Sequence, residues 1–170
     1  MTTNLAACAE ANCLVSRLFE LHHGEIFGYL NRMVANRELA QDLTQDSFIQ
    51  AHRARGRLPE VLNQRAWLYR IATNLALSAL KRRNRFAWLP WLSVDRVTPD
   101  TTEQVGERAV VEAALAVIAP AYRAPLLLYC HYGWSVGEVA AALGINEGAA
   151  RTRVYRAREM FRQEYERGNA

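Results

Sequence analysis

The sequence of 170 residues has few of the features that mark a disulfide framework, a metal centre or a membrane anchor. Its three cysteines, Cys8, Cys13 and Cys130, are irregularly spaced and imply no set of disulfides. The adjacent His22 and His23 would point to different sides of a helix, so they make a poor metal pair. No apolar run reaches membrane-spanning length, and the N-terminus lacks a basic segment followed by a hydrophobic one. We therefore expect a cytoplasmic protein with no membrane insertion, metal or cofactor.

Charge is unevenly distributed along the chain, although the net charge is only +4. Residues 1–52 carry three arginines against six carboxylates, a balance of −3. Residues 53–85 carry nine cations against Glu60 alone, a balance of +8. A block this basic is a candidate phosphate-binding surface, and the alternative is an ordinary solvated or protein-facing surface.

Helical periodicity divides the chain into two groups of helices. The pattern predicts helices at about 14–34, 37–55 and 64–83, and then at 105–118 and 122–132. Between the groups, Pro90 and Pro99 interrupt a segment whose aromatic residues, Phe86, Trp88 and Trp91, favour packing on a domain or a partner. We predict an all-α fold of two small helical domains. The predicted parts are a disordered N-terminus at 1–13, a domain at 14–85, a flexible linker at 86–104 and a domain at 105–170.

The second domain ends in a helix-turn-helix pattern. Ser135 followed by Glu138 is a capping box that starts one helix, Gly144 ends it, and Asn146 caps the next. That second helix has an apolar stripe of Ala150, Val154, Ala157 and Phe161. Its opposite side carries Arg151, Thr152, Tyr155, Arg156 and Arg162. A helix held by one face and presenting arginines on the other is typical of a major-groove reader. The alternative is a solvated helix whose arginines only maintain solubility.

The helix predicted at 37–55 has an unusual outer face. Asp42, Gln45, Asp46 and Ile49 share this face, opposite an apolar stripe that Phe48 widens. Two carboxylates would suggest acid–base catalysis only if other groups converged on them. The sequence shows no nucleophile–base pair, phosphate-cradling loop or metal spacing, so we do not expect an enzyme. An apolar residue amid acids favours a protein contact over a solvated face.

Three segments resemble, in the same order and spacing, the extracytoplasmic-function sigma factors of bacterial RNA polymerase. These segments are DLTQDSF at 42–48, AWLYRIATNLALSALKRRNR at 66–85 and WSVGEVAAALGINEGAARTRVYRARE at 134–159. The resemblance implies a chain that binds core RNA polymerase and directs transcription initiation at promoter DNA. Because the family is usually held inactive by an anti-sigma factor, often membrane-bound, we expect such a partner here by analogy.

The resemblance also implies roles for individual residues. The implied polymerase-binding residues are Asp42, Gln45, Asp46, Phe48 and Ile49. Melted minus-ten DNA would be held by Arg57, Asn63, Gln64, Asn74, Lys81, Arg82, Arg83 and Arg85. The minus-thirty-five element would be read by Arg151, Thr152, Arg153, Tyr155, Arg156 and Arg158.

Three positions, in two segments, depart from the family pattern. Gly148, Ala149 and Ala150 stand where the family usually has Gly-Thr-Val, and Ser78 stands where it commonly has Asp. The alternative function is a stand-alone helix-turn-helix transcriptional regulator. That function would leave the acidic face and the basic block unexplained.

Overall fold

The computed structural model describes residues 3–55, 61, 63–86 and 105–169, and within these ranges the regular structure is helical throughout. The helices are α1 (Thr3–Val34), α2 (Arg37–Arg53), α3 (Gln64–Phe86), α4 (Val105–Val117), α5 (Pro120–Leu126), α6 (Val136–Leu143) and α7 (Glu147–Gly168). A π-helical segment, η2 (Leu127–His131), joins α5 to the turn before α6. The all-α prediction is confirmed.

The ends of the predicted helices differ from the observed ones in two places. Helix α1 begins at Thr3, so the backbone of residues 3–13 is helical where we predicted a disordered N-terminus. The physical reason is composition, since this stretch has four alanines, the best helix formers, and no glycine or proline. Helix α3 runs on to Phe86, and the rest of the predicted linker, with Trp88 and Trp91, lies outside the described residues.

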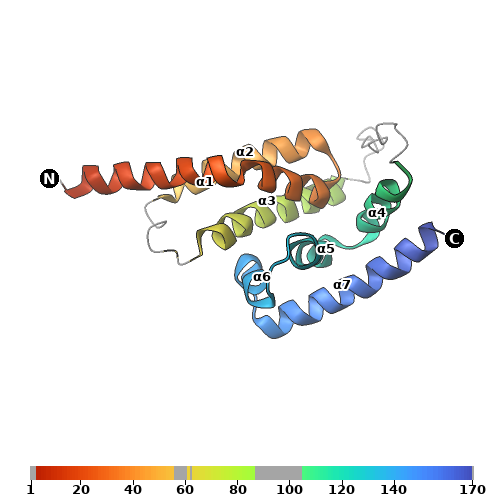
Figure 1. The fold of residues 1–170 in the computed structure, drawn as a ribbon. Helices are drawn as coiled ribbons and strands as arrows, with labels where there is room; N and C mark the ends of the chain where they lie inside the picture. Colours follow the sequence, from red (N-terminus) through yellow and green to blue (C-terminus); the bar gives the residue numbers. More distant parts are fainter. Residues whose placement is uncertain (1–2, 56–60, 62, 87–104, 170) are drawn as a thin grey trace.

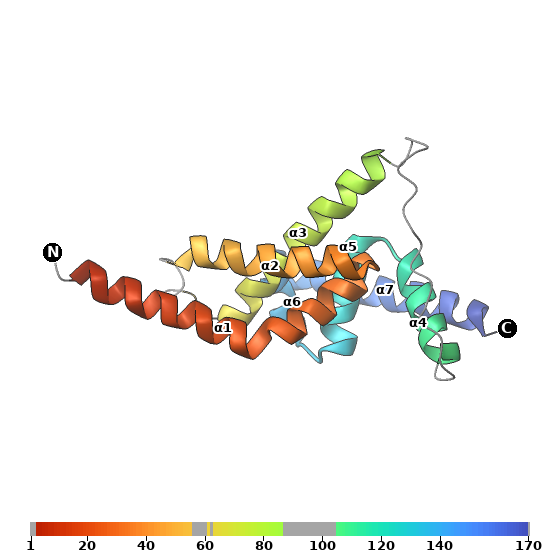
Figure 2. The same cartoon turned by 90° about the horizontal axis from the view of Figure 1, so that it is seen from above.

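Helices α1, α2 and α3 form the first group. Figure 1 shows α1 and α2 side by side, and Figure 2 shows α3 crossing them obliquely. Asn36 caps α2 by accepting a hydrogen bond of 2.7 Å from the Leu39 N–H. The fully buried Tyr29 of α1 shares a 2.8 Å hydrogen bond with the Thr73 hydroxyl of α3, so these two buried hydroxyls satisfy each other.

The helix-turn-helix forms as its capping residues predict. The Ser135 hydroxyl accepts from the Glu138 N–H, and the Glu138 carboxylate accepts from the Ser135 N–H at 2.9 Å. Gly144 ends α6 with φ of 64°, in the left-handed region that glycine adopts without strain. Asn146 then caps α7 by accepting from the Ala149 N–H at 2.8 Å.

The segment predicted as one helix at 122–132 is helical but changes type within its length. Pro120 occupies the first turn of α5, where a missing N–H costs little. Pro125 lies inside the helix and cannot donate to the preceding turn. Directly after it the helix widens into η2, which closes with a bond from the Tyr132 N–H to the Leu127 carbonyl.

The two groups of helices pack against each other and share one hydrophobic core. Arg123 of α5 is only 6% exposed and lies at their boundary. Its guanidinium donates to the Met33 carbonyl at 2.6 Å, and to the Ala116 and Ile118 carbonyls at 2.8 and 3.0 Å. These carbonyls lie at the C-terminal ends of α1 and α4, where helices leave acceptors unpaired. Burial lowers the pKa of this guanidinium.

We predict that Arg123→Ala lowers the free energy of unfolding by about 3 kcal/mol, because three carbonyls, two of them in buried hydrogen bonds, lose a charged donor. Arg123→Lys should recover only part of the loss, since one ammonium cannot match the fork that reaches two helices. Urea denaturation followed by circular dichroism measures both. Arg108→Ala removes an exposed arginine from α4 and should change stability by no more than about 0.5 kcal/mol. Equal midpoints for Arg123→Ala and Arg108→Ala would show that the guanidinium does not hold the helix ends.

Candidate nucleic-acid interface

The outer face of α7 is open and cationic. The side chains of Arg151, Thr152, Arg156 and Arg158 are exposed, and Tyr155 is 67% exposed. On the opposite face Ala150, Val154 and Ala157 are buried, so the helix is held by one side as the stripe predicts. Arg153 is half-buried at the edge between the two faces.

Some side chains on this face already have a hydrogen-bond or ion-pair partner within the described chain, and others do not. The Thr152 hydroxyl donates to the Gly148 carbonyl at 2.9 Å, so its hydrogen is already engaged. Arg162 pairs with Glu159 at 3.0 Å. Among the described residues, no ion pair involves Arg151, Arg153, Arg156 or Arg158. These four guanidiniums are available to an anionic partner.

Helix α3 carries most of the described part of the basic block, and Arg53 and Arg55 lie at the end of α2 and just after it. The side chains of Asn74, Lys81 and Arg82 are exposed, while Arg83 and Gln64 are half-buried. Gln64 and Asn74 are ten positions apart on one helix, about 15 Å along its axis. They cannot therefore contact the same base. Arg57 and the side chain of Arg85 lie outside the described residues.

Asn63 has a structural role that its place in the sequence did not reveal. Its side-chain oxygen accepts a hydrogen bond of 2.8 Å from the Ala66 N–H, at the start of α3. Its carbonyl accepts from the Trp67 N–H at 3.0 Å. Asn63 therefore caps α3, and only its amide N–H groups remain for another partner.

The acidic face of α2 is exposed, with one exception among the five residues predicted to bind polymerase. Asp42, Gln45 and Asp46 are exposed, and Ile49 is 39% exposed. Phe48 is only 7% exposed, and its ring lies 4.9 Å from that of Phe19, centroid to centroid. An aromatic ring in the seam between α1 and α2 gains more from burial than from solvent exposure. Phe48 therefore lies beneath the exposed face in this structure. Its predicted part in polymerase binding stays a prediction.

A cluster of aromatic and charged side chains joins α3 to the helix-turn-helix, and sequence reasoning missed it. Trp134 is 4% exposed, and its ring lies 4.7 Å from that of Tyr69. The Arg65 guanidinium lies 4.8 Å from the Trp134 ring centroid and pairs with Glu25 at 3.2 Å. The Tyr132 hydroxyl donates to the Glu25 carbonyl at 3.3 Å. We call Glu25, Arg65, Tyr69, Tyr132 and Trp134 the junction cluster.

Burial in this cluster raises the pKa of the Tyr69 and Tyr132 hydroxyls above the usual value, because desolvation disfavours the charged form. Nearby, the Arg70 guanidinium of α3 lies against the turn at Gly144. It is so close that a Cβ added at Gly144 would lie only 3.0 Å from it. The turn of the helix-turn-helix is therefore seated on α3.

Two family models and several known proteins are similar to this chain. A sigma-70 region 2 model matches residues 18–86, and a sigma-70 region 4 model matches residues 108–161. The RNA polymerase sigma factor CarQ of Myxococcus xanthus is 36% identical over 151 residues, which cover 86% of each chain. The ECF RNA polymerase sigma factor SigE of Mycolicibacterium smegmatis is 33% identical, over 85% of this chain and 59% of SigE. The chain belongs to the extracytoplasmic-function (ECF) sigma factors. As a sigma factor, it binds core RNA polymerase and directs promoter-specific transcription.

Two solved sigma factors share the fold. One is RpoE from Bartonella quintana in complex with the anti-sigma factor NepR, with a TM-score of 0.75 and 22% identity over 89% of this chain and 96% of that one. The other is CnrH in complex with the cytosolic domain of CnrY, with a TM-score of 0.68 and 23% identity over 93% and 94%. The region 2 match falls on α1, α2 and α3, and the region 4 match falls on α4 to α7. A stand-alone regulator would have no need of region 2, so that alternative is not favoured. Within the described part of the chain, no helix is long and apolar enough to cross a membrane.

We predict that Arg65→Met loosens the junction cluster, because it removes a cation from over the Trp134 ring and from Glu25. Loss of a partly desolvated cation–π contact of about 1–2 kcal/mol should raise the fraction of molecules with Trp134 exposed by roughly five- to thirtyfold. Hydroxyl-radical footprinting reports the exposure of this side chain directly. Arg108→Ala serves as the control and should leave the footprint of Trp134 unchanged. An unchanged footprint in Arg65→Met as well would mean that Tyr69 alone secures the indole.

Proposed function

We propose that this sigma factor reads the minus-thirty-five element with α7, holds melted minus-ten DNA along α3, and docks on core RNA polymerase through α2. The observation that carries the proposal is the outer face of α7. Four guanidiniums without ion-pair partners in the described chain stand on a helix that is buried on its other side and capped at its start. This arrangement suits insertion of the first turns of α7 into the major groove, with Arg151 and Arg156 contacting bases or phosphates.

The proposed polymerase contact consists of Asp42, Gln45, Asp46 and Ile49. Two carboxylates and an exposed aliphatic side chain on one face fit a partner helix with basic residues around an apolar position. Phe48, packed on Phe19, keeps this face of α2 at a fixed distance from α1.

The proposed minus-ten surface follows α3 from its first turn to its basic end. Gln64 and Asn74 are far enough apart to contact different nucleotides, while Lys81, Arg82 and Arg83 contact the phosphate backbone. Asn63 contributes as the cap that fixes the start of α3, and its side chain is exposed. Arg57 and Arg85 are proposed to join this surface on the family resemblance alone.

Promoter geometry requires the two groups of helices to separate. The two promoter elements are about 25 base pairs apart, which is about 85 Å of duplex at roughly 3.4 Å per base pair. A compact chain of this length has a radius of gyration of about 16 Å, so it cannot reach both elements while its halves share one core. We propose that the junction cluster opens in the initiation complex, while residues 87–104 keep the halves connected.

We further propose that an anti-sigma factor controls this protein, as the complexes of RpoE with NepR and of CnrH with CnrY suggest. The chain would act in the cytoplasm and catalyse no reaction of its own. Sigma factors act as DNA-binding initiation subunits, and the chemistry of transcription belongs to the polymerase.

We predict that Asp42→Lys and Asp46→Lys each weaken binding to core RNA polymerase by about tenfold or more, because each places a cation against a basic partner. Thermal stability should change little, since both side chains are exposed. Titration of labelled core polymerase measures the affinity. Glu166→Lys makes the same charge reversal on α7 and should leave the affinity within about twofold. Equal affinity for all three variants would remove α2 from the interface.

We predict that Arg156→Ala and Arg151→Ala reduce transcription most at promoters that depend on the upstream element. A contact to a base edge should cost about 1–3 kcal/mol and relax the preference at one position, whereas a phosphate contact should weaken all sequences alike. Transcription with core polymerase from a promoter library separates the two patterns. Arg167→Ala removes a guanidinium that is paired with Glu164 near the end of the same helix, and it should behave as wild type. Wild-type selectivity and strength in the first two variants would assign the groove contact to another surface.

A further inference from the structure

The π-helical segment η2 lies between the buried anchor of α5 and the junction cluster. On its N-terminal side Arg123 donates to three carbonyls, and Leu127 and Leu128 at the start of η2 are buried. On its C-terminal side Tyr132 and Trp134 belong to the junction cluster. The turn that η2 adopts therefore decides where these two rings stand relative to α3.

The hydrogen bonds of η2 are those of a widened turn. The Tyr132 N–H donates at 3.0 Å to the Leu127 carbonyl, five residues earlier, whereas an α-helix bonds residues four apart. The Trp134 N–H donates at 3.1 Å to the Leu128 carbonyl. Such a turn holds one residue more than an α-turn. Conversion of η2 to an α-turn would therefore rotate the chain after it by roughly 100° and shift it by about 1.5 Å along the axis.

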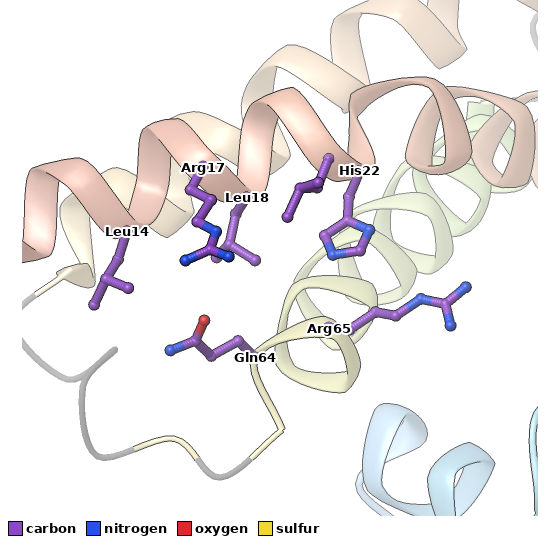
Figure 3. A pocket seen from close by; sticks show the side chains of 7 residues that line it. Leu14, Arg17, Leu18, His22, Gln64 and Arg65 are labelled. Carbon is purple, nitrogen blue, oxygen red and sulfur yellow. The ribbon is translucent and has the colours of Figure 1, made fainter.

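The widened turn matches the positions of two rings in the junction cluster. The Tyr132 ring lies 5.8 Å from that of Tyr69 and 6.1 Å from that of Tyr29, centroid to centroid. Trp134 contacts Tyr69 and the Arg65 guanidinium, and Figure 3 shows Arg65 extending from the start of α3 toward α6. A rotation of roughly 100° would turn both rings away from these partners. The cluster is therefore compatible with the π-turn and incompatible with an α-turn.

The residues on either side of the widened turn leave room for this change. Cys130 and His131 are exposed, so burial does not fix their positions. Gly133 follows with φ of 69°, a left-handed conformation that glycine adopts without strain. No atom of the described chain lies within 4 Å of a Cβ added there. Before the turn, Pro125 has no N–H to donate, so α5 already lacks one helical bond.

We propose that η2 is a register switch for the junction: its π-turn holds the two groups of helices together, and an α-turn in its place releases them. Because π-turns are rare, a stabilising contact is needed to hold one, and the ring contacts of Tyr132 and Trp134 supply it in the closed form. The proposal rests on the proposed opening of the junction cluster in the initiation complex. It adds an element with two discrete arrangements, which a transition between closed and open forms requires.

Gly133→Ala tests the switch in the full chain without polymerase. Alanine is strained at a φ of 69°, so the closed form should lose stability and the fraction of open molecules should rise by about fivefold or more. Hydroxyl-radical footprinting of Trp134 measures this fraction. Gly106→Ala makes the same substitution at an exposed position of α4 with open space around it, and it should leave the footprint unchanged. An unchanged footprint in Gly133→Ala would overturn the proposal.

A second measurement distinguishes a change of register from simple loosening of the junction. Gly133→Ala combined with Arg65→Met should make the open form a large share of the population, because the two changes act on different groups. Scalar coupling across the hydrogen bond of the Tyr132 N–H identifies its acceptor by nuclear magnetic resonance. The acceptor should change from the Leu127 carbonyl to the Leu128 carbonyl. Greater exposure of Trp134 with the coupling still to Leu127, or with no coupling, would overturn the switch.

Deletion of Cys130 enforces the α-turn directly, because it removes the extra residue from η2. Trp134 should then be modified as fast as a surface indole. Slow amide exchange in α6 and α7 should persist, since the caps of both helices depend on near neighbours in the chain. A Trp134 that stays protected in a chain with this intact helix-turn-helix would overturn the proposal.

These measurements use the free chain, so their failure is distinct from failure of the proposed opening on polymerase. Labels on α2 and α7 report the distance between the two groups of helices when the wild-type chain joins core polymerase and promoter DNA. An unchanged distance would contradict the opening itself and, with it, any use of the switch. A longer distance together with a negative result in the free chain would overturn only the role of η2.

Discussion

The arrangement of the described helices depends on one buried guanidinium. Arg123 donates to carbonyls at the C-terminal ends of α1 and α4, two helix ends that carry partial negative charge and lack intrahelical donors. By joining these ends, it fixes α5 between the two groups of helices. Segment η2 continues directly from α5 and leads to Trp134 and α6, so these bonds and the junction cluster together place the helix-turn-helix on α3.

The bonds of Arg123 are divided unequally between the two halves of the chain. Two of its acceptors, the Ala116 and Ile118 carbonyls, belong to the same half as Arg123, and only the Met33 carbonyl belongs to the other. Separation of the halves would therefore cost this guanidinium a single protein partner, which water can replace once the site is exposed. The junction cluster has a similar character, because Glu25 and Arg65 are partly exposed and would be hydrated when it opens. A junction of wholly aliphatic side chains would lose its entire buried area to water without such compensation.

The sequence predicts the features of this fold that arise from near neighbours in the chain. The capping box at Ser135, the left-handed Gly144 and the Asn146 cap depend on residues three or four positions away, and all three form as predicted. Arg123 could not be identified in this way, since its acceptors include a carbonyl 90 positions earlier, and an isolated arginine is ordinarily exposed. The same limit applies to Tyr69 and Trp134, whose apolar rings indicate burial but not the partner. Phe48 and Asn63 were assigned to binding surfaces because family resemblance gives positions, whereas packing and capping decide which atoms remain free.

Arginine supplies the cationic groups both in the packed interior and on the candidate DNA surfaces. Only one of the 21 cationic side chains, Lys81, is a lysine. A planar guanidinium can reach several carbonyls at once, as Arg123 does, or lie over an aromatic ring, as Arg65 lies over Trp134 and Arg37 over Phe27. A lysine ammonium would fill these positions poorly because it is compact and strongly hydrated. What separates a structural arginine from a candidate DNA contact is therefore its surroundings. Arg65 and Arg123 have acceptors or rings from the chain itself, whereas Arg151 and Arg156 face solvent without an ion-pair partner among the described residues.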